Sequence, residues 1–191
     1  FYTMVTLVSG YWKLPTSKFN DETYKMWMRN TLAIHAPMIF FVDLSDQTLV
    51  DTVKAARPTN VPTHYIHKTL DEFVIMNRKE CKGVSEPRHC PDTDLGRIWL
   101  EKIALVAEAS VLNPFQSEWF CWYDAGMCAY RDTPPPALSW PLSTHGLKKN
   151  CLNYTLSPLA YENSTHRYKY GTHWHKITGT CLIMHHSTTA K

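Results

Sequence analysis

The sequence predicts one α/β domain, built on a mostly parallel mixed sheet with helices on both faces. Two observations predict this fold class. Short apolar runs of β-branched and aromatic residues alternate with amphipathic segments of about ten or more residues, which is the length of a crossover between parallel strands. In addition, 44% of the 191 residues are hydrophobic, enough for a single core. We expect the domain to fill residues 1–191, with the chain cut at both ends.

Predicted strands and helices alternate through the first half of the chain. In order, the strands and helices expected here are 4–10, 20–35, 38–43, 45–58, 63–68 and 69–79. Asn20 or Asp21 is expected to cap the first helix, and Pro37 lies just beyond its end. The third helix opens with a capping box, formed by Thr69 and Glu72 three residues later. Each helix is therefore bounded by a recognisable signal.

The second half begins with a loop at residues 80–94, which contains glycine and two prolines. Residues 92–114 then form the clearest predicted helix, with one apolar stripe and a proline at its end. The fourth strand is expected at 118–126. After it the alternation stops at the "TPPP" of residues 133–136, and strand character returns only at 175–187.

Charge and hydropathy exclude two classes of partner for these residues. The formal net charge is only +3, and no run of Lys or Arg tracks a phosphate backbone, so we expect no nucleic acid partner. No apolar segment approaches the roughly 20 residues that span a bilayer. A membrane anchor is therefore expected only outside residues 1–191.

The cysteines and glycosylation sequons favour an oxidising compartment. The six cysteines are even in number and lack the paired CxxC spacing of a zinc site. Sequons begin at Asn153 and Asn163, and Cys81 and Cys90 flank a proline-containing loop that suits a disulfide. We expect the secretory lumen, in the Golgi or the endoplasmic reticulum, or the extracellular surface. A cytoplasmic protein with six buried thiols remains the alternative.

Two predicted strands end on aspartate, at Asp43 and Asp124. In parallel sheets, ligands bind in the crevice outside the carboxyl ends of the strands. The glycine-rich dinucleotide motif, the Walker phosphate loop and the GxSxG elbow are all absent from the sequence. An acidic edge with nearby cations suits a diphosphate, bridged to a carboxylate by a divalent cation or held directly by cations. The nearby cations are Lys13, Lys18, Arg97, Lys102 and Arg131.

Residues 99–132, "WLEKIALVAEASVLNPFQSEWFCWYDAGMCAYRD", resemble the core signature of the HtrL/YibB-like family. The opening "TLVSGYW" and the "IFFVD" of the second strand agree with that family in order and spacing, so the resemblance covers about two thirds of the chain. This family is similar to nucleotide-diphosphosugar transferases of the GT-A type. The resemblance therefore implies a GT-A fold and a glycosyltransferase activity, with a nucleotide-diphosphosugar as donor and a glycan or glycoprotein as acceptor.

The resemblance also implies positions for the donor and a metal ion. Asp124 takes the place of the first aspartate of the GT-A DxD motif, and Gly126 that of the second. With one carboxylate missing, Mn²⁺ or Mg²⁺ needs another ligand, for which His185 or His186 are the candidates. Otherwise the site works without metal, and Lys102 and Arg131 neutralise the diphosphate.

The implied donor nucleoside lies near Ser9, Gly10 and Asp43, and the acceptor enters from the side of residues 173–186. Several simpler interpretations stay open. Asp124 followed by two small residues also suits a turn, and Asp43 also suits the cap of the following helix. At the level of the whole protein, the alternatives are an inactive transferase-like domain that binds glycans or serves a structural role in a secreted or surface assembly, and a zinc-dependent hydrolase that uses the late histidines.

Overall fold

The computed structural model describes residues 5–17, 19–75, 90, 92–137, 144–156 and 177–189. In this part of the chain, six strands form one sheet in the order β3-β2-β1-β4-β6-β5. The first four strands in this order are parallel to one another, and β6 runs antiparallel to both of its neighbours. The predicted class, an α/β domain with a mostly parallel mixed sheet, is confirmed.

The structure places the strands and helices close to their predicted ranges. The strands are β1 (Val5–Tyr11), β2 (Met38–Val42), β3 (Thr63–His67), β4 (Trp119–Tyr123), β5 (Asn153–Leu156) and β6 (Ile177–His185). The helices are α1 (Asp21–Thr31), α2 (Gln47–Ala56), α3 (Thr93–Leu112) and the short α4 (His186–Thr189), with 3₁₀ turns η1 (Leu70–Glu72) and η2 (Cys128–Tyr130). Asn20 caps α1, because its side chain accepts a hydrogen bond from the Thr23 N–H at 2.8 Å.

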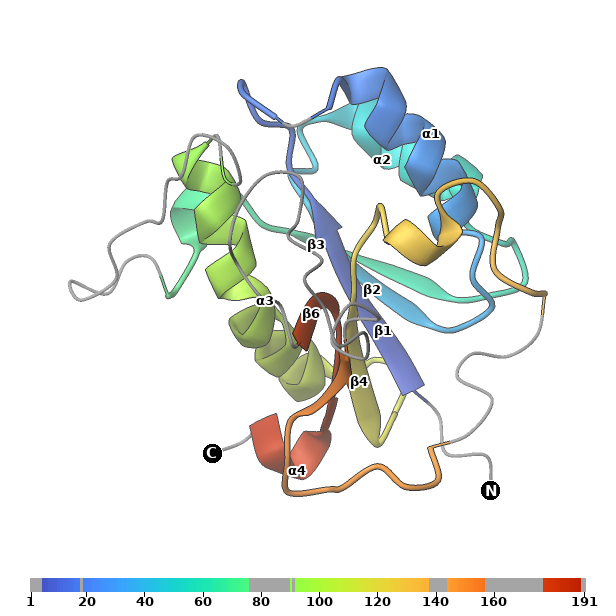
Figure 1. Cartoon of the computed structure of the whole chain (residues 1–191), viewed down its shortest axis with the longest axis vertical. Coiled ribbons are helices and arrows are strands. Elements are labelled where there is room, and N and C mark those ends of the chain that lie inside the picture. Colours follow the sequence, from blue (N-terminus) through green and yellow to red (C-terminus); the bar gives the residue numbers. More distant parts are fainter. Residues whose placement is uncertain are drawn as a thin grey trace, which may run out of the picture.

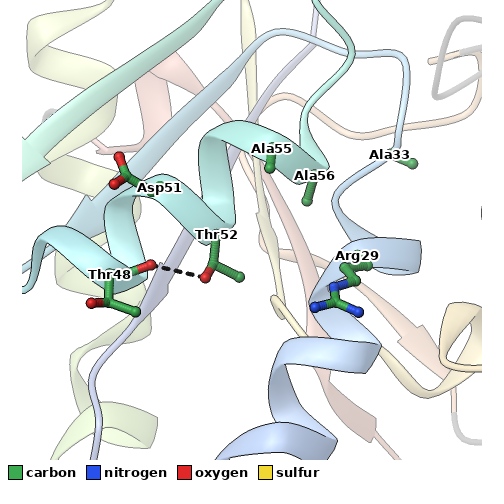
Figure 2. Close-up of a pocket in the computed structure, with 7 residues that line it drawn as sticks. All are labelled: Arg29, Ala33, Thr48, Asp51, Thr52, Ala55 and Ala56. Atoms are coloured by element: carbon green, nitrogen blue, oxygen red, sulfur yellow. Dashed lines mark hydrogen bonds between the residues drawn. The ribbon is translucent and has the colours of Figure 1, made fainter.

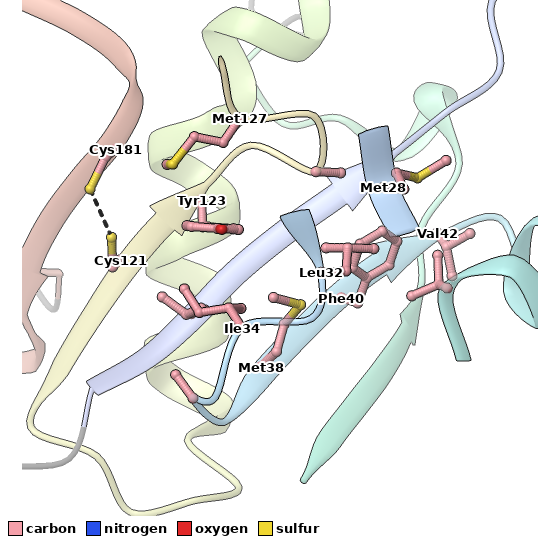
Figure 3. Packing of buried hydrophobic residues seen from close by; sticks show 14 of the residues in the cluster. Met28, Leu32, Ile34, Met38, Phe40, Val42, Cys121, Tyr123, Met127 and Cys181 are labelled. Carbon is pink, nitrogen blue, oxygen red and sulfur yellow. Dashed lines mark hydrogen bonds between the residues drawn. The ribbon is translucent and has the colours of Figure 1, made fainter. Parts of the chain in front are cut away.

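Helices cover both faces of the sheet, as predicted (Figure 1). α1 and α2 lie on one face, where Met28, Leu32 and Val53 pack against alternate residues of the central strands (Figure 3). α3 lies on the other face, where Leu105 and Val106 pack against the intervening strand residues. Alternation along each strand thus supplies two cores, one on each side of the sheet. We call these the α1/α2 face and the α3 face.

The prediction of a helix at 69–79 is wrong for residues 69–75. The capping box of Thr69 and Glu72 is present, but only the 3₁₀ turn η1 follows it. Phe73 is extended and fully buried, and the carboxylate of Glu101 in α3 accepts hydrogen bonds from the N–H groups of Val74 and Ile75. Burial of Phe73 and these two bonds to α3 hold the segment out of a helix. Residues 76–79 lie outside the described residues.

The sheet contains one strand that the sequence analysis missed. β5 is short and lies at the edge of the sheet, where it pairs with β6. Its direct neighbour β6 is antiparallel to β4, with Trp119 opposite His185 and Tyr123 opposite Cys181. The C-terminal end of β6 therefore lies next to the beginning of β4.

None of the helices in the described residues is long and apolar enough to cross a membrane.

Candidate functional site

The carboxyl ends of β1, β2 and β4 bring three predicted residues to one edge of the sheet. Gly10 pairs with Phe41 of β2, two residues before Asp43. On its other side β1 pairs with β4, with Val8 opposite Trp122, so Gly10 lies beside Asp124. Neighbouring strands are about 4.8 Å apart, which places Asp43 and Asp124 on strands separated by about 10 Å. The structure therefore confirms the shared edge.

Asp124 is held by two side chains from the α3 face. Lys102 of α3 donates a hydrogen bond to Oδ1 of Asp124 at 2.8 Å, and the indole N–H of Trp122 donates to the same oxygen at 2.5 Å. The Lys102 ammonium lies 5.5 Å from the centroid of the Trp122 ring. The side chain of Lys102 is only 10% exposed and that of Asp124 is 27% exposed, so the pair is largely shielded from water.

Asp124 keeps one carboxylate oxygen available for a ligand. Both of its side-chain hydrogen bonds use Oδ1, and no residue in the described ranges donates to Oδ2. The main-chain carbonyl of Asp124 accepts from Met127 N–H at 3.0 Å, so the residue also opens a turn. The turn and the ligand-binding interpretation are compatible, because the turn uses the main chain and the side chain remains at the strand end.

Asp43 lies at the start of the loop that leads into α2. Its Oδ1 accepts hydrogen bonds from the N–H and the hydroxyl of Ser45, at 2.9 and 2.7 Å. These bonds hold the pKa of Asp43 below its usual range, with a smaller contribution from His67. The helix cap itself is Asp46, whose carboxylate accepts from Leu49 N–H. The alternative that the "VDLSD" stretch caps this helix therefore holds for Asp46 and not for Asp43.

A pocket of about 210 Å³ opens at the ends of β1 and β2. Its lining residues come from β1, the loops after β1 and β2, α2 and η1: Tyr11, Trp12, Lys13, Asp43, Asp46, Leu49, Thr69 and Leu70. Trp12 is fixed there by a 2.7 Å hydrogen bond to the Lys68 carbonyl and by edge-on packing against Phe73. The pocket therefore combines a rigid ring, two carboxylates and one cation.

Gly10 contributes space rather than a binding group. A Cβ atom at this position would lie 2.7 Å from the Trp12 ring and 3.0 Å from the Phe41 carbonyl oxygen. Glycine is thus required for Trp12 to lie against β1. Ser9 is fully buried on the α1/α2 face, and its hydroxyl has no hydrogen-bond partner among the described residues. Ser9 therefore does not reach the pocket.

Arg131 lies on the other side of the sheet from Lys102. Its guanidinium carbon is 3.7 Å from the centroid of the Trp27 ring of α1, and its Nε donates to the Gly126 carbonyl at 2.9 Å. The Lys102 side chain comes instead from α3 on the opposite face. Lys102 and Arg131 were expected to lie together, so that both neutralise a single diphosphate. The structure does not bring them to one position.

His185 and His186 lie at the opposite end of the strands from Asp124. His185 pairs with Trp119 at the beginning of β4, whereas Asp124 follows the end of that strand. The separation is about 17 Å along five strand residues. The reason is the antiparallel direction of β6, which periodicity does not reveal. The structure therefore does not bring either histidine to Asp124 as a metal ligand.

The described residues contain no group of three or more His, Cys, Asp or Glu that could hold a metal ion. Asp124 already has the Lys102 ammonium at 2.8 Å, in the position where a cation would bind its Oδ1. The side chains present therefore do not fit a Mn²⁺ or Mg²⁺ site. The "HWH" of residues 173–175, the basis of the zinc alternative, lies outside the described residues, as do Lys18 and the first four residues (173–176) of the expected acceptor side.

The predicted disulfide and glycosylation sites are described only in part. Cys81 and Asn163 lie outside the described residues. Cys90 is buried, and its thiol donates to the Asp92 carbonyl. Asn153 lies in β5, and its amide nitrogen has three main-chain carbonyl oxygens within 3.3 Å, including that of Lys148. A glycan on this nitrogen would displace part of that network.

A second, larger hollow lies between α1 and α2 and contains none of the predicted residues (Figure 2). Its volume is about 780 Å³. Small side chains and two charged ones line it: Arg29, Ala33, Thr48, Asp51, Thr52, Ala55 and Ala56. It has neither the buried ion pair nor the fixed aromatic ring of the carboxyl edge. We therefore place the candidate site at the carboxyl edge.

Sequence reasoning missed the roles of Trp12, Trp122 and Trp27. The alternation rule was sufficient to find Trp122, since a residue two positions before Asp124 lies on the same face of the strand. No local signal identifies the other two. Trp12 is fixed by Lys68, and Trp27 by Arg131, both far away in sequence.

The class defined by this geometry is an α/β domain with a candidate ligand site at the carboxyl edge of a mixed sheet. No protein-family model matches the chain, and no curated protein matches it. The HtrL/YibB resemblance therefore stays a prediction. Among solved structures, the chain is similar to mouse xyloside xylosyltransferase 1 in its apo form, with 7% identity and a TM-score of 0.49. That likeness covers 98% of this chain and 68% of the mouse chain.

Proposed function

We propose that this chain binds a nucleotide-diphosphosugar at the carboxyl edge and transfers its sugar to a glycan acceptor. The observation that carries the proposal is the Asp124 carboxylate, fixed at the end of β4 through Oδ1 while Oδ2 faces no described donor. A fixed acceptor oxygen at this edge suits a sugar hydroxyl. The pocket beside it, with Asp43 and Lys13, supplies further groups for the nucleoside and the phosphates.

We assign the cations at this edge to the phosphates of the donor, and the pocket carboxylates Asp43 and Asp46 to its hydroxyl groups. Lys102 neutralises Asp124, so this carboxylate does not repel a diphosphate. Lys13 lines the pocket and is 64% exposed, and its ammonium forms an ion pair with Asp21 at 3.5 Å. We propose that the phosphates replace Asp21 as the partner of this exposed ammonium. Donor binding with these cations, and without Mn²⁺ or Mg²⁺, is part of the proposal.

The proposed reaction forms a bond between an acceptor hydroxyl oxygen and the anomeric carbon of the donor sugar. The bond from that carbon to the diphosphate oxygen breaks, the diphosphate leaves with the bonding electron pair, and the hydroxyl proton passes to solvent water. The leaving diphosphate gains negative charge as this bond breaks, so a cation at the pocket stabilises it more than the ground state. Lys13 is the side chain proposed for this role.

A thermal shift with UDP-, GDP- and CMP-sugars, with and without Mn²⁺, tests the proposal. At a ligand concentration 100 times Kd, binding stabilises the folded state by about 2.7 kcal/mol, or roughly 5–10 °C in Tm. Asp124→Asn and Asp43→Asn should reduce the shift, while the matched Asp51→Asn on α2 should leave it unchanged. Absence of a shift with every nucleotide sugar would refute donor binding.

A glycan-binding module without catalysis is the second candidate. Two observations favour it. Asp124 is paired internally with Lys102, and Gly126 stands where the resemblance places the second carboxylate of a metal-dependent transferase. Binding of glycans, together with no shift by any nucleotide sugar, would select this candidate.

We further propose that the chain belongs to the secretory lumen or the extracellular surface, with a glycan at Asn163 or Asn153. Expression in a secreting cell, followed by peptide N-glycosidase treatment and mass measurement, tests this. Asn163→Gln and Asn153→Gln identify the modified residue. A secreted protein of unmodified mass would contradict the glycan proposal.

A further inference from the structure

Arg131 is an arginine whose inner end is held in place by other described residues. Its side chain stacks on Trp27, its Nε donates to the Gly126 carbonyl, and its own carbonyl accepts from the Asn30 amide at 2.8 Å. No carboxylate among the described residues forms an ion pair with it, and none of the described residues accepts a hydrogen bond from its two Nη atoms. Of its five N–H donors, one forms a hydrogen bond with a described residue.

A half-buried cation of this kind is suited to bind an anion. The planar guanidinium presents two parallel N–H groups that match the two oxygens of a carboxylate, phosphate or sulfate. Stacking on Trp27 and the bond to Gly126 fix its orientation before a ligand arrives. Little conformational entropy is therefore lost on binding, which increases affinity.

An exposed aromatic ring lies beside this cation. Phe19 is 45% exposed, and its ring packs edge-on against Trp27 with centroids 4.7 Å apart. The Arg131 guanidinium carbon is 6.0 Å from the Phe19 ring centroid. Tyr24 supports the arrangement, with ring contacts to both Phe19 and Trp27. The surface thus offers one apolar ring face next to one set of charged donors.

The position of this surface relates it to the candidate donor site. Gly126, whose carbonyl holds Arg131, follows Asp124 by two residues, so the two groups are at most about 7 Å apart along the main chain. Arg131 lies on the α1/α2 face, whereas Lys102 lies on the α3 face. The two cations therefore lie on different sides of the Asp124 turn.

We propose that Phe19 and Arg131 form a subsite for an acidic sugar of the acceptor, whose ring lies on Phe19 and whose carboxylate is bound by Arg131. This inference rests on the proposed function, because it names the class of acceptor for that same site. The binding itself requires no donor. It is therefore measured without nucleotide sugar, and its failure is distinguishable from failure of donor binding.

The test is a binding titration of the full chain with two matched oligosaccharides. One ends in a hexuronate, and the other is the same molecule after reduction of its carboxyl group to an alcohol. The acidic form should bind about tenfold more tightly, as expected for a bidentate charge-assisted pair. Equal affinity of the two forms would overturn the proposal.

Variants separate the two parts of the subsite. Arg131→Gln should remove the difference between acidic and reduced oligosaccharides, while Phe19→Ala should weaken binding of both. Arg29→Gln, on the outer surface of α1, is the matched control and should change neither. Arg131→Lys keeps the charge but lacks the planar fork, so it should recover only part of the difference. Thermal unfolding of each variant verifies that it folds.

Inorganic phosphate provides the last arm, as a competitor of the acidic oligosaccharide. Weak competition supports a subsite that requires the sugar ring as well as the anion. Competition at an affinity equal to that of the oligosaccharide, together with no effect of Phe19→Ala, would overturn the assignment to an acidic sugar and leave a simple anion site.

Discussion

Lys102 and Asp124 form a 2.8 Å ion pair that joins the middle of α3 to the carboxyl end of β4. Removing one partner leaves the other charge largely buried and unpaired, which is more costly than removing both. We expect Lys102→Met to lower the free energy of unfolding by about 3 kcal/mol. Adding Asp124→Asn should recover part of that loss, measured by urea denaturation of both single variants and the double variant. Additive effects would show that the pair is not coupled.

Gly10→Ala should destabilise the protein, because its Cβ would lie 2.7 Å from the Trp12 ring. The expected loss is about 1–3 kcal/mol, as for other overpacked sites. Gly126→Ala is the matched control. Its Cβ would make an ordinary contact of 3.5 Å with the Trp27 ring, so its stability should stay close to that of the parent. Chemical denaturation measures both, and equal effects at the two glycines would contradict the steric explanation.

Arg57 is 6% exposed and fixes the chain after α1. Its guanidinium donates to the carbonyls of Leu32, Ile34 and Ala36, at 2.7–2.9 Å. Arg57→Met leaves these carbonyls without their donor, at about 1–3 kcal/mol for each buried group left unsatisfied. We expect a loss of at least about 3 kcal/mol in the free energy of unfolding, against a negligible change for the exposed Arg29→Gln. A loss below 1 kcal/mol, on the same scale, would show that water replaces the arginine.

His185 should make stability depend on pH. Burial lowers the pKa of His185, with further lowering by His186 and Lys149 and opposition from Glu118. The unfolded chain therefore binds the proton more readily than the folded chain, whose His185 stays neutral to lower pH. Stability from this residue is fully present above about pH 6.5 and declines below it, by at most about 1.4 kcal/mol per pH unit.

Denaturation at several pH values, compared with His185→Gln, measures this contribution. The variant should show a shallower loss of stability on acidification than the parent. His64→Gln, at an exposed position of β3, is the control and should leave the profile unchanged. Identical profiles for the parent and His185→Gln would exclude a role for His185.

The cysteines should differ widely in reactivity. Cys121 and Cys181 are buried with their sulfurs 3.4 Å apart, and burial raises the pKa of the Cys121 thiol. Cys151 is exposed. With an aromatic disulfide reagent, Cys151 should react at least about tenfold faster than Cys121, because reaction needs an accessible thiolate. Mass mapping of the modified thiols against time is the measurement, and comparable rates would mean that the core opens readily.

The alternation of strands and helices was predictable because it depends on local patterns. Short apolar runs indicated the first four strands, and a period of about 3.6 residues indicated three of the helices. The positions of Asp43 and Asp124 at one edge followed, since crossover helices make the strands parallel. The helix predicted at 69–79 failed because Glu101, distant in sequence, binds the N–H groups of Val74 and Ile75.

From the sequence, the candidate site could be predicted only as the place where several strands end. By itself the sequence determined the α/β class, and it indicated that Asp124 ends a buried strand. Only the tertiary structure decided that β6 is antiparallel, which takes His186 away from Asp124, and that Lys102 and Arg131 lie on opposite faces. The physical reason is that these features depend on contacts between distant residues, such as Asn30 with Arg131 across 101 positions, whereas periodicity reports only on neighbours.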